Sequence, residues 1–316
     1  RFEYQGTADL SPDDQIVFGA EDENTRFSSV GTFSNDRGHT SIYGFYGQYQ
    51  KTLFETLTLT GGVRYDHHDQ FGSHTSLKLA GAWWPVDGTV LHANYGDGFK
   101  APSLYELFSQ YGTPGLKPET ARGWEVGGEQ AFFDKAVHAS LTYFSRNTEN
   151  LIDFQSCFVA TPPAQCAVQP SGFYFNIDRT RVTGIEAEVS GNVTDTVSVT
   201  LDYTNMDAKD RTTGLALNRR PRNTASAIIE WSPSNWGLGA SVSYVDRQID
   251  QYDTSTVPPT AFINGSHTTV NLLGHYDFDQ WSLYGRVENL FAERYEPVLG
   301  YGAPGRTFFA GIRFNQ

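Results

Sequence analysis

The sequence lacks any apolar run that approaches the roughly 20 residues a membrane-spanning helix needs, so it excludes a helical membrane protein. Basic residues are also few: 23 Lys and Arg stand against 36 Asp and Glu, which gives a formal net charge of -13. No basic stripe is available to replace the counterions of a nucleic acid, so we expect no nucleic-acid partner. Methionine occurs once, beside 31 Gly, 22 Phe and 17 Tyr, a composition that favours an aromatic-rich sheet over a helical core.

Cysteine is almost absent as well: Cys157 and Cys166 share one long polar segment. Their spacing favours a local disulfide, which suits an oxidising exterior or periplasm, and two free thiols are the alternative. No neighbouring His or Cys completes a tetrahedral set, so we expect no metal site at this pair. The run Asp66 to Asp69, with His74 nearby, also fails as a metal site because adjacent residues of an extended chain point oppositely; we interpret it as a solvated loop.

Short turns and long polar connections alternate along the whole chain, with ten-residue stretches of alternating hydrophobicity between them. The short turns are predicted at 11–14, 52–56, 85–88, 133–135, 192–196, 232–235 and 277–280. The long connections are predicted at 28–39, 67–74, 99–121, 155–173, 207–221, 248–266 and 293–305. Tight turns at one end and long loops at the other are typical of outer-membrane β-barrels, with the turns in the periplasm and the loops outside.

The stretches between these connections have the period-two pattern of barrel strands. In residues 57–66 and 197–203, for example, small aliphatic residues face one way and polar residues the other, as a lipid face and a wet lumen require. Strands are predicted at 1–9, 16–27, 40–51, 57–66, 75–84, 89–98, 122–132, 136–154, 174–191, 197–206, 222–231, 236–247, 267–277, 281–292 and 306–314. The prediction is an all-β, antiparallel transmembrane barrel wall of about 15 strands.

Single-chain bacterial barrels have even strand numbers, and the pattern starts in mid-strand, so we expect further strands before residue 1. A plugged barrel of about 22 strands would need roughly seven more and an N-terminal plug. We therefore treat 1–316 as one partial barrel domain, with the plug and the N-terminal strands outside it.

Three sequence blocks point to a family. One strand ends in a block whose informative residues are Phe99, Lys100, Ala101, Pro102, Leu104, Glu106 and Leu107, followed by Leu116, Pro118 and Glu119. The second contains Asn176, Gly184 and Glu186, and the third contains Asn289, Leu290, Phe291, Tyr295, Gly305 and Arg306. In this order and spacing they resemble the F-[RK]-A-P-x-L-x-E-L…L-K-P-E, N…G-[IV]-E-x-E and V-x-N-L-F…Y…P-G-R blocks of TonB-dependent outer-membrane receptors.

The resemblance implies a multi-pass protein of the bacterial outer membrane that transports a scarce metal chelate, cobalamin or a ferric siderophore, and is not an enzyme. Of these two substrates, cobalamin is ranked slightly ahead of a ferric siderophore because the sequence blocks are compact. The implied partners are outer-membrane lipid and lipopolysaccharide, the barrel-assembly machinery, and the TonB complex acting through the plug. Residues 113–116 read Thr-Pro-Gly-Leu where the family often has Asn-Pro-Asn-Leu, and this difference weakens the assignment to the haem-binding subgroup of the family. No cofactor is implied.

The long loops carry the candidate ligand contacts. The aromatic candidates, which offer rings to a flat ligand, are Tyr111, Phe158, Tyr252 and Tyr301. Arg219 and Arg220 offer guanidinium groups to an anionic chelate or to lipopolysaccharide, and a simple balancing of charge on an acidic chain is the alternative. A passive porin-like channel is the competing function, and it predicts ion conductance by this chain alone. A barrel enzyme would need a Ser, His and Asp set in a motif context, which the sequence lacks.

Overall fold

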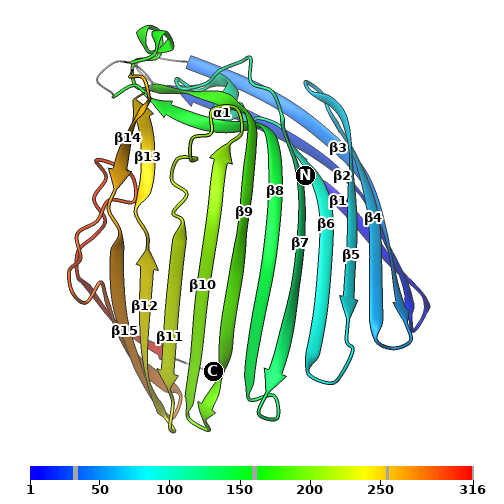
Figure 1. Ribbon diagram of the computed structural model, residues 1–316, viewed down its shortest axis with the longest axis vertical. Coiled ribbons are helices and arrows are strands. Elements are labelled where there is room, and N and C mark those ends of the chain that lie inside the picture. The colour runs from blue at the N-terminus through cyan, green and yellow to red at the C-terminus, as the bar shows by residue number, and fades with distance from the viewer. Residues whose placement is uncertain (31–34, 159–161, 254–255, 315–316) are drawn as a thin grey trace.

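The computed structural model describes residues 1–30, 35–158, 162–253 and 256–314. Fifteen strands form one sheet in which each strand is antiparallel to the next along the chain (Figure 1). They are β1 (Phe2–Ser11), β2 (Asp14–Val30), β3 (Asn35–Leu53), β4 (Leu57–His68), β5 (Gly72–Trp83), β6 (Thr89–Lys100), β7 (Glu119–Phe132), β8 (Val137–Ser156), β9 (Gly172–Thr194), β10 (Val197–Asp210), β11 (Asn223–Trp231), β12 (Trp236–Val245), β15 (His267–Phe278), β16 (Trp281–Glu288) and β17 (Thr307–Phe314). A separate hairpin pairs β13 (Gln248–Asp253) with β14 (Thr260–Asn264). The predicted all-β, antiparallel wall of fifteen strands is confirmed.

The connections are sorted by end, as the sequence predicts. Figure 1 shows tight turns along one edge of the curved wall, and the helix α1 (Leu104–Phe108) and the β13–β14 hairpin beyond the opposite edge. The turn between β5 and β6 closes at Gly88, whose φ of +78° is a conformation that L side chains rarely adopt. By the barrel rule the tight turns are periplasmic and the long connections extracellular.

Two connections are shorter than the sequence predicts. The predicted loop 67–74 is mostly strand, because β4 runs to His68 and β5 begins at Gly72. The predicted loop 28–39 is likewise strand up to Val30 and again from Asn35. The solvated-loop interpretation is therefore wrong for residues 66–68, which are in β4, and holds only for Asp69, which is exposed in the turn. Asp66 and His68 are buried, and His68 Nε2 lies 3.0 Å from the Thr40 hydroxyl.

The two faces of the sheet differ in chemistry. One face exposes apolar side chains such as Leu59, Val63 and Leu79, which are 45%, 49% and 59% exposed. The other carries ion pairs, in which the Arg64 guanidinium lies 2.7 Å from Asp66 and 3.1 Å from Glu21. An apolar outer face and a polar inner face suit a wall between lipid and a wet lumen. No helix in the described ranges is both long and apolar enough to cross a bilayer.

The buried apolar residues of the described ranges gather toward the loop end of the wall. Val182, Ala208 and Leu217 form one buried cluster, with Phe144, Leu151, Ile177 and Met206 packed against it. Leu104, Leu107 and Leu116, in the β6–β7 connection, are 5%, 2% and 4% exposed. The extracellular connections are therefore held by side-chain packing, whereas the wall below is held by its backbone ladder.

Candidate ligand-binding site

The β6–β7 connection holds the first family block and folds back onto the wall. Pro102 precedes α1, and Ser103 caps the helix: its hydroxyl accepts from the Glu106 amide while the Glu106 carboxylate accepts from the Ser103 amide. Leu104 and Leu107 are the buried face of this five-residue helix. On the other side the ring of Tyr105 meets Phe27 of β2 edge-on, at 6.1 Å between centroids. The block thus anchors one connection against β2 and β3.

Lys100 joins the two ends of this connection. Its ammonium lies 2.9 Å from the Glu119 carboxylate and 3.6 Å from that of Glu106. Glu119 Oε1 also accepts from the Ile152 amide of β8. Three charged residues of the first family block therefore hold the loop closed, which is a scaffolding role.

Asn176 of the second block ties the same connection to β9. Its side-chain oxygen accepts from the Lys117 amide at 2.9 Å, and its Nδ2 donates to the carbonyl oxygens of Lys117 and Asn150 at 3.0 and 2.7 Å. One amide side chain of β9 thus links the β6–β7 connection to β8, two segments that lie far apart in the sequence. Beside it the Thr113 hydroxyl donates to the Tyr174 carbonyl at 2.7 Å.

We expect Asn176→Ala to loosen this connection. Three hydrogen bonds disappear, so the free energy of opening residues 113–118 should fall by about 2–3 kcal/mol at roughly 1 kcal/mol for each bond. Amide hydrogen exchange of this segment measures the change. Asn192→Ala, at the exposed far end of the same strand, is the matched control. Equal exchange in the two variants would show that Asn176 does not hold the loop.

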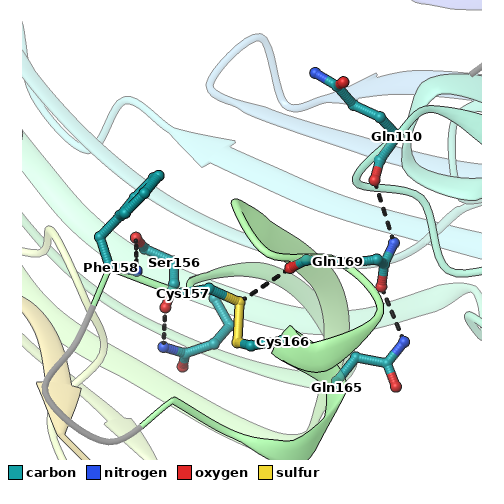
Figure 2. Close-up of a disulfide and its surroundings, with 8 residues drawn as sticks. Gln110, Ser156, Cys157, Phe158, Gln165, Cys166 and Gln169 are labelled. Carbon is teal, nitrogen blue, oxygen red and sulfur yellow. Dashed lines mark hydrogen bonds between the residues drawn. A yellow bond between two sulfur atoms is a disulfide. The ribbon is translucent and has the colours of Figure 1, made fainter. Parts of the chain in front are cut away.

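The β8–β9 connection contains the two cysteines, and the structure joins them in a disulfide with Cα atoms 5.7 Å apart. Both are buried, at 6% and 7% exposed. Figure 2 shows Gln169 beside the disulfide, with its carbonyl oxygen 3.2 Å from Cys157 Sγ. The Gln169 side chain donates to the Gly112 carbonyl at 2.8 Å and accepts from Gln165 at 2.9 Å. The disulfide-closed loop is thus bound to the β6–β7 connection.

Four aromatic rings meet where these two connections join; we call Tyr105, Tyr111, Phe154 and Tyr174 the ring cluster. Neighbouring centroids lie 5.2 Å apart for Phe154 and Tyr174, 5.7 Å for Tyr111 and Phe154, and 6.2 Å for Tyr105 and Tyr174. Tyr105 is 45% exposed, and the other three rings are half-buried. The ring of Tyr105 is therefore accessible among the loops, and the other three rings pack behind it.

A second group of loops meets at Asp250, which is 3% exposed. Its Oδ1 accepts from Arg219 Nε at 3.0 Å and from the Leu299 amide at 3.2 Å. The Arg219 amide also donates to the Ile249 carbonyl. The β10–β11 connection, the β13–β14 hairpin and the β16–β17 connection are therefore joined at one carboxylate.

The third family block closes the last of these connections. Asn289 is buried. Its side-chain Oδ1 accepts from the Glu293 backbone N–H at 2.8 Å, and its Nδ2 donates to the Glu293 carbonyl oxygen at 2.9 Å. Tyr295 stacks on His267 of β15 with centroids 3.9 Å apart. Phe291 is 71% exposed and Arg306 is exposed. Most of this block, like the first, shapes the base of a loop.

The predicted ligand contacts lie in different surroundings. Tyr111 belongs to the ring cluster, whereas Phe158 and Tyr301 are single rings that are 79% and 74% exposed. Arg219 is engaged by Asp250, while Arg220 is exposed. Burial of Tyr252, which is in β13, raises the pKa of its phenol. Sequence reasoning missed Tyr105, Phe154 and Tyr174, although Tyr105 lies within the first family block.

Two further features do not form the site. Within the described ranges, no group of three or more His, Cys, Asp or Glu side chains is placed to hold a metal ion. A hollow of about 670 Å³ on the wall is lined by outward side chains such as Leu79, Tyr95 and Trp124, so it lies on the lipid face and away from the loops. The loops around the ring cluster and Asp250 remain as the candidate site.

Comparison with known proteins agrees with this architecture. A family model described as TonB dependent receptor-like, beta-barrel, matches residues 2–290. The fold is similar to the ferric enterobactin receptor PfeA of Pseudomonas aeruginosa, with a TM-score of 0.76 at 22% identity over 98% of this chain and 53% of that one. It is also similar to the siderophore receptor PirA of Acinetobacter baumannii, with a TM-score of 0.77 at 20% identity over 99% and 54%. The chain thus spans about half the length of these proteins, and at such identities the likeness is one of fold.

Proposed function

The chain belongs to the TonB-dependent receptor β-barrel family, which places it in the bacterial outer membrane, and from this we propose that the whole protein is an active transporter of a ferric siderophore. In this proposal the chain supplies fifteen strands of the wall and several extracellular loops. The plug and the remaining strands belong to the rest of the receptor. The TonB complex supplies energy through the plug, and a metal chelate is the cargo.

The ring cluster is the observation that carries the choice of ligand. Its four rings lie at the junction of two extracellular connections, with Tyr105 partly exposed and Tyr111 and Tyr174 behind it. Aromatic rings bind other flat aromatic groups by offset or edge-on contacts, each worth about 0.5–1.5 kcal/mol beyond buried area. Siderophores that chelate iron through aromatic groups have such faces. The similar structures described above are a ferric enterobactin receptor and a siderophore receptor, and this supports placing a ferric siderophore before cobalamin.

The test is binding by the full-length receptor in detergent to ferric enterobactin, a ferric pyoverdine, cobalamin and haem. We expect saturable, submicromolar binding of one ferric siderophore. Tyr105→Ala and Tyr301→Ala should each weaken it about three- to tenfold, which corresponds to about 0.7–1.4 kcal/mol for a lost ring contact. Phe133→Ala is the matched control, since this ring is 80% exposed in a turn at the opposite end of the wall.

Binding of cobalamin or haem alone would contradict the choice of a ferric siderophore as ligand, and the receptor function would still be supported. No binding by any of the four, together with steady conductance of the 316-residue chain in a planar bilayer, would favour a passive channel.

A further inference from the structure

Gln169 lies between the disulfide of the β8–β9 connection and the segment that carries Tyr111. Figure 2 shows its side chain directed toward Gln110, the residue before Tyr111, and its backbone beside the disulfide. Its Nε2 donates to the Gly112 carbonyl oxygen at 2.8 Å and lies 3.5 Å from the Gln110 carbonyl oxygen. Its own carbonyl oxygen is 3.2 Å from Cys157 Sγ. One side chain is thus bonded to the backbone on both sides of Tyr111.

The backbone of Tyr111 is held by two elements. Its carbonyl oxygen accepts from the Tyr174 amide of β9 at 3.0 Å, while Gln169 holds the carbonyl groups on either side of it. The Tyr111 ring meets Phe154 edge-on, with centroids 5.7 Å apart, and lies 6.5 Å from the ring of Tyr105. Because the direction of a side chain follows the conformation of its backbone, a change in this backbone moves the ring.

The Phe154 ring is held by the strands themselves. Phe154 of β8 pairs with Tyr174 of β9, and a side chain at Gly172 would overlap its ring. Gly172 has a φ of +139°, which suits glycine and leaves that space to the ring. Of the two rings in contact, only Tyr111 therefore depends on Gln169.

The disulfide attaches Gln169 to the wall. The β8–β9 connection is joined to the wall where β8 ends and where β9 begins. The Gln169 amide donates to the Gln165 carbonyl, and the Gln169 carbonyl accepts from the Gly172 amide, so both bonds are local. The disulfide adds a further attachment, because Cys157 directly follows β8 and Cys166 lies shortly before Gln169. Since a cross-link limits the conformations of the segment it closes, it limits the movement of Gln169.

We propose that the Cys157–Cys166 disulfide and Gln169 are positioning residues of the ligand site. The disulfide holds Gln169, Gln169 holds the backbone of residues 110–112, and this backbone sets where the Tyr111 ring lies in the ring cluster. The inference rests on the proposed function, because the ring cluster is the part of that site that receives an aromatic chelate. The disulfide and Gln169 do not touch the ligand and act through Tyr111.

The first measurement needs no ligand. Fluorotyrosine is incorporated at position 111 of the full-length receptor in detergent, and its fluorine NMR resonance reports the surroundings of the ring. We expect one resonance in the wild type. Cys157→Ala/Cys166→Ala and Gln169→Met should each shift or split it, because the ring loses its fixed place beside Phe154. Gln169→Met keeps the length of the side chain and the disulfide and removes only the side-chain hydrogen bonds.

Val168→Ala is the matched control for both variants. Val168 lies in the same segment, next to Gln169, and its side chain is 78% exposed. The substitution should leave the resonance at position 111 unchanged. An unchanged resonance in Cys157→Ala/Cys166→Ala and in Gln169→Met would overturn the positioning role, and it would show that the Tyr174 amide alone fixes the backbone of Tyr111.

The second measurement is the affinity of the same receptor for ferric enterobactin, which chelates iron through aromatic rings. We expect Cys157→Ala/Cys166→Ala and Gln169→Met each to weaken binding about two- to tenfold, the range for one aromatic contact. In a Tyr111→Ala background neither change should weaken it further, because the ring through which they act is gone. A general loosening of the loop would instead lower the affinity by the same factor in both backgrounds.

The two measurements separate this inference from the proposed function. Equal factors in the two backgrounds would overturn the action through Tyr111. Failure of the wild-type receptor to bind ferric enterobactin would contradict the proposed ligand. A shifted resonance in the same preparation would still show that the disulfide and Gln169 position the ring.

Discussion

Replacing Asp250 by Ala should release three extracellular connections together. The substitution leaves the Arg219 guanidinium and the Leu299 amide without their acceptor in a nearly closed site. Removing one partner of a buried ion pair costs about 3–5 kcal/mol, and because Arg219 is about one-third exposed we expect roughly 3 kcal/mol. Amide hydrogen exchange should rise together in residues 211–222, 248–253 and 295–303.

Asp87→Ala is the control for this experiment. Asp87 also pairs with a cation, Lys135, at 2.9 Å, but at 86% exposure. The Lys135 ammonium lowers the pKa of the Asp87 carboxyl. A fully exposed pair of this kind is screened by water and salt and contributes little to stability, so exchange at the loop end should not change. If Asp250→Ala raises exchange only in its own hairpin, the three connections are not joined through its carboxylate.

Leu107→Ala should detach α1 from the wall. Leu107 is 2% exposed, so the loss of its side chain removes apolar contacts and leaves a cavity. Such a change costs about 2–5 kcal/mol, and because the helix has only five residues the connection cannot reorganise around it. Exchange of the amides of residues 103–116 should approach that of an open loop.

Leu107→Met keeps the volume of the side chain and should cost less than about 1.5 kcal/mol. Ferric siderophore affinity should fall in Leu107→Ala and hold in Leu107→Met, because Tyr105 of the ring cluster is carried by the same helix. Protection of residues 103–116 that is equal in the two variants would mean that the capping box and the Lys100 ion pairs hold the helix without Leu107.

The wall was predictable because one physical pattern repeats along it. Every strand in contact with lipid must alternate apolar and polar residues, so all fifteen strands of the sheet could be located from the sequence. The β13–β14 hairpin was missed because it lies beyond the lipid. Its first strand reads Gln-Ile-Asp-Gln-Tyr-Asp, without an apolar face, and Pro258 and Pro259 follow. Helix α1, with five residues, is too short to show a helical period.

The candidate site was only partly predictable. The roles of the family-block residues depend on partners far away in the chain. Asn176 is hydrogen-bonded to Lys117, which is 59 residues away in the sequence, and no local sequence pattern predicts that contact. The ring cluster likewise combines Tyr105, Phe154 and Tyr174 from three segments. Loop lengths near residues 28–39 and 67–74 were overestimated because strands beyond the bilayer carry polar residues on both faces.

The Asn176 and Gln169 contacts have a mechanical consequence. Because they tie the β6–β7 connection to the β8–β9 connection and to β9, a displacement of one connection also strains the hydrogen bonds to the other and to the strand. A load applied at Tyr105 is therefore shared by both connections. The load reaches β9 through the hydrogen bonds between Asn176 and Lys117.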